Sequence, residues 1–240
     1  MGERSQASAR REPQTKGTVE AVEGYRTMIE VTYIDHMGSD LSVVNAARVS
    51  FGKTHKAMTE GDTKLIHYLA KHKHMSPFGH AFASFHVKAP IFVARQLVKH
   101  KFLRWNEVSR RYVDDLPEIY HPEKWRKRSK DKKQGSEGFI TQMETRSDQT
   151  VDHFYRIQCI SALDVYHDAI ATGVCPEQAR MVLPQSTMTE WYWSGSLDAF
   201  MDMCNLRCKE DTQYETRLVA DYIRSEMIKL FPISVEALVK

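Results

Sequence analysis

The residues best suited to chemistry lie between Arg95 and Tyr112. Six of these 18 residues are Arg or Lys, whereas Glu107 is their only acid. A solvated helix face carries charges of both signs at spacings of three and four residues, so this composition instead indicates an anion site. Its anion would be a phosphorylated small molecule or a nucleic acid. Uncharged hydrogen-bonding side chains stand between the cations, namely Gln96, His100, Asn106 and Ser109.

The bulk properties of the chain exclude several classes of protein. Its 240 residues are 42% hydrophobic and 10% aromatic, which is enough to fill the core of one large or two small domains. The formal net charge of +3 gives no general nucleic-acid signature, so affinity for anions must arise locally. No run of about 18 apolar residues is present, so we expect no membrane span. Arg10-Arg11 precedes no apolar stretch, so we expect no secretion signal.

The cysteines and a group of histidines bear on compartment and on metal binding. Without C-x-x-C spacing, and in a chain too large to need disulfides, the four cysteines favour a reducing, cytoplasmic setting. Cys204 and Cys208 lie four residues apart and favour core packing over metal binding, because two thiols alone make a poor metal site. Pro77 interrupts the segment from His72 to His80, which contains no carboxylate, so we expect no metal there.

Helical spacing places the first half of the basic stretch at the end of a helix. Pro90 suits a first helical turn, and a helix over residues 90–99 would bury one apolar side. Gln96, Lys99 and His100 would share its other edge, because residues three and four apart are neighbours on a helix. This stretch therefore presents an amide, an ammonium and an imidazole together.

The other elements follow from patterns of apolar residues. We expect strands at 27–35, 81–88 and 189–193, and a turn through 102–105 followed by an extended piece at 108–112. We expect further helices at 41–49, from 62 or 63 onward, at 140–171, from Pro176 through Arg180, at 197–207, and from a capping box of Thr212 and Glu215 to about residue 230. Lys124–Gly138 is expected to be an exposed loop. Residues 1–24 have almost nothing to bury, which predicts a flexible tail.

Lys99-His100-Lys101, seven further residues and then Ser109 resemble the signature of the flavin-dependent thymidylate synthases. That signature is usually Arg-His-Arg, seven residues and Ser. Around it, these positions match in register: Gln96, His100, Asn106, Glu107, Ser109, Arg111 and Tyr112. Other segments resemble the family in the same order: Ala46–Phe51, His74–Phe78, Ala179–Pro184, Asn205–Arg207 and Gln213–Glu215. The resemblance covers about residues 28–235.

The resemblance implies reductive methylation of dUMP to dTMP. Methylenetetrahydrofolate would supply the carbon, FAD would relay hydride, and NADPH would supply that hydride, without a cysteine nucleophile. It further implies an α+β fold, an antiparallel sheet packed with long helices, in a single domain at 25–240. Family members are homotetramers whose active sites draw residues from more than one subunit.

Site residues are carried over by position. Arg207 would lie against the uracil edge as the catalytic cation, favouring the N3-deprotonated ring. The nucleotide set, which would hold dUMP, is Gln96, Lys99, Glu107, Val108, Ser109, Arg110, Arg111 and Arg180. The flavin set, which would meet FAD, is His74, Ser76, Lys99, His100, Lys101, Glu107, Ser196, Asp198 and Asp202.

Departures from the family pattern concentrate in the flavin set. Lys99 and Lys101 replace arginines and lose their planar fork. Gly79 stands where Glu is usual, and Asp198 stands where Arg is usual. Ser196 and Asp202 both stand where Asn is usual. We therefore expect nucleotide binding to be kept and the flavin to be held differently.

Three alternatives remain open. Basic residues interleaved with Phe102, Trp105 and Tyr112, together with the segment 124–133, would suit a single-stranded nucleic-acid binder. A flavoprotein of the same fold without synthase activity is a second alternative, given the altered triplet. A surface salt-bridge network would be a purely structural reading of Gln96, Lys99 and Glu107.

Overall fold

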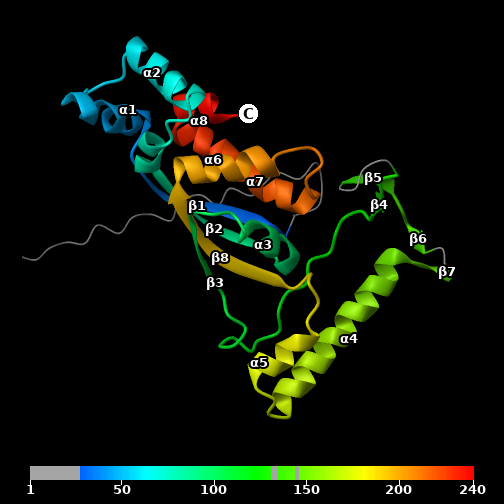
Figure 1. The fold of residues 1–240 in the computed structure, drawn as a ribbon. Helices are drawn as coiled ribbons and strands as arrows, with labels where there is room; N and C mark the ends of the chain where they lie inside the picture. Colours follow the sequence, from blue (N-terminus) through cyan, green and yellow to red (C-terminus); the bar gives the residue numbers. More distant parts are fainter. Residues whose placement is uncertain (1–27, 131–134, 144–145) are drawn as a thin grey trace, which may run out of the picture.

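The computed structural model describes residues 28–130, 135–143 and 146–240, so the predicted tail at 1–24 lies outside the described residues (Figure 1). Its centre is a four-stranded antiparallel sheet in the order β1-β2-β8-β3. The strands are Glu30–Met37 (β1), Phe82–Pro90 (β2), Leu103–Glu107 (β3) and Met188–Ser196 (β8). The sheet and its long helices confirm the predicted α+β class.

The two central strands bury alternate side chains, as a half-covered sheet requires. On β2, Phe85 and Val87 are fully buried, and on β8 the same holds for Trp191 and Trp193 to within 1%. Phe200 packs edge-on against Phe85 and Trp193, with ring centroids 5.3 and 5.5 Å apart. Burying each such aromatic stabilises the fold by roughly 1.5–3 kcal/mol, so this layer anchors the sheet to the helix above it.

Helices cover one face of the sheet (Figure 1). They are Leu197–Arg207 (α6), Tyr214–Leu230 (α7) and Pro232–Leu238 (α8), with Asp40–Arg48 (α1) and Glu60–Lys71 (α2) beside α8 and short 3₁₀ turns at Val49–Phe51 (η1) and Ser76–His80 (η2). The predictions do not include α8. Its first turn is held by the buried Asp40, whose carboxylate accepts from the backbone N–H of Ile233 and Ser234 over 3.0 and 2.9 Å.

The helix that carries Gln96 is α3, Ile91–Leu97, which starts directly after β2. The free N–H groups of its first turn are satisfied by the segment before β8: Ile91 donates to the Thr187 carbonyl at 2.9 Å, and Phe92 donates to that of Gln185 at 3.1 Å. These bonds fix the start of α3 against the sheet. Consequently the end of the helix reaches the start of β3 through a turn in which Phe102 adopts φ +66°.

The second half of the basic stretch differs from its prediction. Residues 103–107 form strand β3 rather than a turn, because they pair with β8 and Trp105 stacks on Trp191 at 4.3 Å. The extended piece predicted at 108–112 is instead a turn, in which the Tyr112 N–H donates to the Ser109 carbonyl at 3.0 Å. Pairing with β8 therefore extends residues 103–107, and the chain turns only after this strand ends.

The segment between the sheet strands also differs from its prediction. The helix predicted from residue 140 begins only at Val151, after the Thr150 side chain caps it by accepting from the His153 N–H at 3.1 Å. Short strands replace part of the predicted loop and the predicted helix start: Arg126–Arg128 (β4), Ser136–Phe139 (β5), Gln142–Met143 (β6) and Arg146–Thr150 (β7). The helix Val151–Ala171 (α4), with Pro176–Ala179 (α5) and the 3₁₀ turn Arg180–Val182 (η3), stands away from the sheet (Figure 1).

The capping box predicted from Thr212 and Glu215 is wrong. Helix α7 is instead capped at Gln213, and the Thr212 hydroxyl donates to the Leu206 carbonyl at 3.3 Å. Glu215 faces a tertiary partner and is only 2% exposed. In the part of the chain that the structure describes, no helix combines the length and apolar character needed to cross a membrane.

Candidate active site

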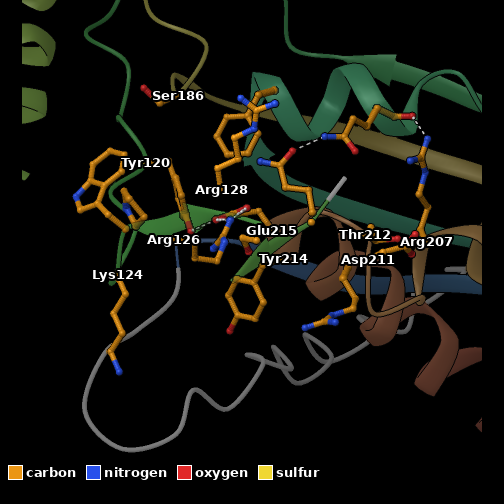
Figure 2. Close-up of a pocket in the computed structure, with 18 of the residues that line it drawn as sticks. Tyr120, Lys124, Arg126, Arg128, Ser186, Arg207, Asp211, Thr212, Tyr214 and Glu215 are labelled. Carbon is orange, nitrogen blue, oxygen red and sulfur yellow. Dashed lines mark hydrogen bonds and ion pairs between the residues drawn. The ribbon is translucent and has the colours of Figure 1, made fainter. Parts of the chain in front are cut away.

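A cavity of about 1220 Å³ opens between α3, the α6–α7 turn and the β4/β5 strand pair (Figure 2). Its lining contains seven Lys or Arg residues and three Asp or Glu residues, so it is a net positive environment that favours anions. The cations come from two segments: Lys124, Arg126, Lys127 and Arg128 before and on β4, and Arg207, Lys209 and Arg217 around the α6–α7 turn.

Arg207, the last residue of α6, forms one end of this cavity. Its Nε donates to Nε2 of His100 at 3.0 Å, and its Nη2 donates to the Gln96 carbonyl at 3.3 Å. Burial lowers the pKa of Arg207, yet a guanidinium remains charged at neutral pH. Because neither bond involves a carboxylate, the positive charge of Arg207 is held in place without being neutralised.

His100 is an uncharged partner of this cation. Burial and the neighbouring Arg207 charge lower the pKa of His100 to about 4, so the ring is neutral at pH 7. A guanidinium only donates hydrogen bonds, so Nε2 must accept and the ring proton must sit on Nδ1. The structure thus assigns both the charge state and the tautomer of His100.

Gln96 connects this end of the cavity to helix α7. Its Nε2 donates to Oε1 of Gln213 at 2.5 Å, while its backbone carbonyl receives the bond from Arg207. Gln213 is the N-cap residue of α7, so α3, α6 and α7 meet at Gln96, Arg207 and Gln213. Among the predicted site residues, the structure therefore brings Gln96, His100 and Arg207 together.

An ion pair between the half-buried Arg126 and the buried Glu215 closes the far wall of the cavity. Arg126 donates from Nη2 to both carboxylate oxygens of Glu215, at 2.9 and 2.8 Å, and its guanidinium lies 5.3 Å from the Tyr214 ring centre. Tyr120 donates to the same carboxylate at 3.4 Å. Burial and this acid raise the pKa of Tyr120. The pair fixes β4 against the start of α7.

The sequence alone assigns no site role to Arg126 or Gln213, and it assigns Glu215 only to a capping box. The segment Gln213–Glu215 belongs to the family resemblance, which is a usable signal for both of its end residues. Arg126, by contrast, lay in an expected loop, and its partner is 89 residues away. Only the fold reveals that pair.

Most of the nucleotide set lies outside this cavity. The Glu107 carboxylate accepts from Trp105 Nε1 at 3.0 Å and from the Thr189 hydroxyl at 2.8 Å, which holds it at the edge between β3 and β8. Beyond it, the Val108 N–H donates to the Glu190 carbonyl at 2.9 Å. Lys99 lies exposed in the turn after α3.

The next residues form a small turn of their own. The Ser109 hydroxyl oxygen accepts from the backbone N–H and Nε of Arg111, both at 3.4 Å, and Arg110 donates to the Asp115 carbonyl at 2.7 Å. Arg180 is exposed beyond α5, with Nε donating to the Glu177 carbonyl at 3.4 Å. Within one chain, these cations do not line the cavity of Arg207.

The flavin set spans two neighbouring elements and the turn after α3. His74 and Ser76 lie at the start of η2, and Ser196 and Asp198 lie at the start of α6, which packs against η2. Asp198 Oδ1 is buried without a hydrogen-bond partner in the described residues. Asp202 lies farther along α6, 3.8 Å from Lys240 Nζ, and Lys101 is exposed. An orphaned carboxylate oxygen is a site for a hydroxyl or N–H donor.

The histidines do not form a metal centre in this structure. Across the described ranges, no group of three or more His, Cys, Asp or Glu side chains is placed to hold an ion. His72 instead packs against the Tyr68 ring with centroids 4.3 Å apart.

A family model and curated relatives of this chain point to the same protein family. Residues 32–233 match the family model described as "Thymidylate synthase complementing protein". A flavin-dependent thymidylate synthase from Thermus thermophilus is 41% identical over 199 residues, which cover 83% of this chain and 71% of that protein. Another from Kosmotoga olearia is 38% identical over 220 residues and covers 89% of both chains.

Solved structures agree with the sequence relatives. The UMP/dUMP methylase PolB from Streptomyces cacaoi, bound with 5-Br dUMP, matches with a TM-score of 0.74 at 30% identity, covering 88% of this chain and 94% of that one. The same enzyme bound with 5-Br UMP matches with a TM-score of 0.73 at 31% identity. Given this agreement over most of the chain, the protein belongs to the flavin-dependent thymidylate synthase family.

Proposed function

We propose that the protein converts dUMP to dTMP, taking the carbon from methylenetetrahydrofolate and hydride from NADPH through FAD. The observation that carries this proposal is the arrangement of Arg207 beside neutral His100 and Gln96 in a positive cavity. A cation held in place but not neutralised stabilises charge that develops on a bound ring.

Arg207 would act on the pyrimidine electrostatically. Its position against the uracil edge would favour the N3-deprotonated ring, which makes the ring carbon more reactive toward the incoming one-carbon unit. Gln96 would orient the nucleotide by hydrogen bonding, with Gln213 and Arg207 fixing its amide and backbone. The proposed route uses no cysteine thiolate on the pyrimidine.

FAD, when bound, would supply the hydride relay. The orphaned Oδ1 of Asp198 would accept a hydrogen bond from a hydroxyl or N–H group of the cofactor. The hydroxyl of Ser196 would donate to or accept from a neighbouring polar group of the cofactor. A carboxylate repels phosphate, so Asp198 does not substitute for an arginine there. Lys99 and Lys101, which have no ion pair within the described residues, would supply point charges instead. Thus the residues fit a flavin nucleotide if the lysines supply positive charge, while Ser196 and Asp198 hydrogen-bond its uncharged polar groups.

We also propose a homotetramer in which a second copy supplies Ser109, Arg111 and Arg180 to the Arg207 cavity. In support, these groups lie outside the cavity of their own chain. Ile157, Ile160 and Val165 on α4 are 44–58% exposed, which leaves apolar side chains of this helix for a partner copy to cover.

The binding partners would be dUMP and folate, with no nucleic acid, and the setting would be cytoplasmic, as the cysteine spacing favours.

Mixing two inactive variants tests the shared site. Arg207→Ala and Arg180→Ala protein, unfolded and refolded together, would regain about a quarter of wild-type activity if each site draws these residues from different subunits. Each variant refolded alone is the control. A monomeric mass in light scattering, or no recovery in the mixture, would contradict the assembly.

Colour and turnover test the function. The purified protein should be yellow, bleach with NADPH, and form dTMP only when methylenetetrahydrofolate is present. None of the three alternatives gains support from the relatives described above, which are named as synthases or as a UMP/dUMP methylase. Colourless protein that retains oligonucleotide with a steep salt dependence would favour the nucleic-acid binder.

A further inference from the structure

Phe102 combines two unfavourable features in the turn after α3. Its side chain is 84% exposed, which is the highest value among the large apolar residues of the described ranges. Its backbone is left-handed, with φ +66°. That conformation disfavours every residue with a Cβ, and a bulky residue there is an outlier. No step of the proposed reaction uses this ring.

The fold requires the backbone of this turn but not the phenyl ring. A Cβ on Gly195 would lie 3.1 Å from the Phe102 carbonyl oxygen, and Leu103 pairs with Gly195, so the main chain is fixed against β8. The ring lies outside this packing, because most of its surface is exposed. Glycine would meet the backbone requirement without strain. Backbone strain kept under a large exposed side chain points to a function for that side chain.

Phe102 lies where the two parts of the flavin set meet. In the chain it directly follows Lys101, the last residue of the triplet. Across the sheet, the next residue, Leu103, pairs with Gly195, which precedes Ser196. A flavin nucleotide held by both parts of the set would therefore pass beside the Phe102 ring.

FAD offers the chemistry that an exposed phenyl ring recognises. It carries two planar ring systems, the isoalloxazine and the adenine, joined through a diphosphate. An aromatic side chain stacks on such rings at little cost in entropy, because it has only two rotatable bonds. Lys101 is also exposed on this turn, so a cation for the diphosphate stands next to the ring.

We propose that Phe102 is a cofactor-binding residue whose ring stacks on an aromatic ring of FAD. This FAD stacking contact rests on the proposed function, because it assumes that FAD occupies the flavin set. A base of single-stranded nucleic acid would also stack on an exposed ring. The structure favours FAD, because Trp105, the next aromatic residue of the basic stretch, is already stacked on Trp191 at 4.3 Å.

Replacing Phe102 separates a binding role from a structural one. Phe102→Gly should raise Tm by about 2–4 °C, since glycine adopts this conformation without strain. The same variant should bind FAD roughly tenfold more weakly, because the stacking ring is gone. Phe102→Leu keeps the strain but loses the ring, so it should weaken FAD binding without raising Tm. Phe102→Trp should retain the affinity for FAD.

Calorimetric titration of FAD into the full chain, after flavin removal, gives the dissociation constants. Thermal melts without FAD give Tm, because bound cofactor would itself shift it. Lys73→Gly, at the other non-glycine residue with positive φ among the described residues, calibrates the gain in Tm. Phe139→Leu removes an exposed ring on β5 and should leave FAD binding unchanged. FMN and ADP each carry one of the two ring systems, so their affinities for Phe102→Leu identify the stacked ring.

Several outcomes would overturn the FAD stacking contact. One is unchanged FAD affinity in Phe102→Gly and Phe102→Leu, whether or not binding of a single-stranded oligonucleotide is lost. Another is FAD affinity in Phe102→Trp as low as in Phe102→Leu. Weaker FAD binding together with a smaller assembly in light scattering would instead place the ring against a second copy. Ring-dependent FAD binding without dTMP formation would contradict the proposed function alone, because calorimetry does not depend on turnover.

Discussion

Arg207 donates its Nε hydrogen bond to an unprotonated Nε2 of His100, over 3.0 Å. The two residues are 107 positions apart, one at the end of α6 and the other just after α3. A cation held by a neutral acceptor keeps its full charge, whereas a carboxylate partner would cancel it. This relationship makes the cavity suitable for stabilising an anionic ring.

Replacing Arg207 tests its role in the reaction. Arg207→Ala should lower kcat by about 10²–10³-fold, as loss of one stabilising donor does in other enzymes, while Tm changes little because the side chain is only half-buried. Arg224→Ala, which removes a surface partner of Asp221, is the matched control. Unchanged turnover in Arg207→Ala would exclude Arg207 from the mechanism.

The lowered pKa of His100 predicts a pH dependence of stability. The unfolded histidine titrates near 6.5 and the folded one near 4, so the unfolded state binds more protons between these values. The free energy of unfolding should therefore fall as pH falls from about 6.5 to 4 and change no further through His100 below that. Urea titrations across this range should show a smaller loss for His100→Gln. An equal loss in both proteins would mean that His100 is not responsible.

The Arg126–Glu215 pair should be a major stabilising contact. Arg126→Ala leaves a carboxylate that is 3% exposed without its partner and should lower the free energy of unfolding by about 3 kcal/mol. Adding Glu215→Gln should recover part of this loss, since the unpaired charge is then gone. Arg156→Ala, in a surface pair with Asp152, should have no measurable effect. Additive losses in the double variant would contradict direct coupling.

Gly195 keeps β3 close to β8. A Cβ at this position would meet Leu103 Cδ2 at 2.4 Å and the Phe102 carbonyl oxygen at 3.1 Å. Gly195→Ala should therefore destabilise the protein by about 1–3 kcal/mol and displace the strand that carries Glu107. Gly79→Ala meets open space and is the control. Urea midpoints would measure both, and equal midpoints would show that β3 tolerates the added methyl group.

The Lys99-His100-Lys101 triplet should bind FAD less tightly than a triplet with arginines at both ends. Lys99→Arg/Lys101→Arg restores two planar guanidinium groups, which bind phosphate in two-point geometry, and should tighten FAD binding about tenfold in calorimetry. Lys71→Arg, on α2, controls for an added guanidinium elsewhere. Wild-type FAD affinity equal to that of the double variant would show that the triplet does not limit flavin binding.

Local sequence patterns determined most elements of the sheet and its covering helices. The alternation at 81–88 and the helical stripe of Leu197, Phe200, Met201 and Cys204 appear in the structure as β2 and the buried side of α6. Such patterns work because one buried face imposes its period on the chain. The matched motifs also predicted the family, since residues from 46 to 215 recur in the family order.

The tertiary structure alone decided where the basic stretch changes direction and which residues meet. Residues 103–107 are a strand because Trp105 stacks on Trp191, 86 positions away in the sequence. Arg126 lies on strand β4 instead of in the predicted loop, and its guanidinium pairs with the buried carboxylate of Glu215. The sequence by itself determined the chemical types available to the site, Arg207 and His100 among them. Only the packing of α3 against α6 brought these two together, because local periodicity does not specify contacts between distant segments.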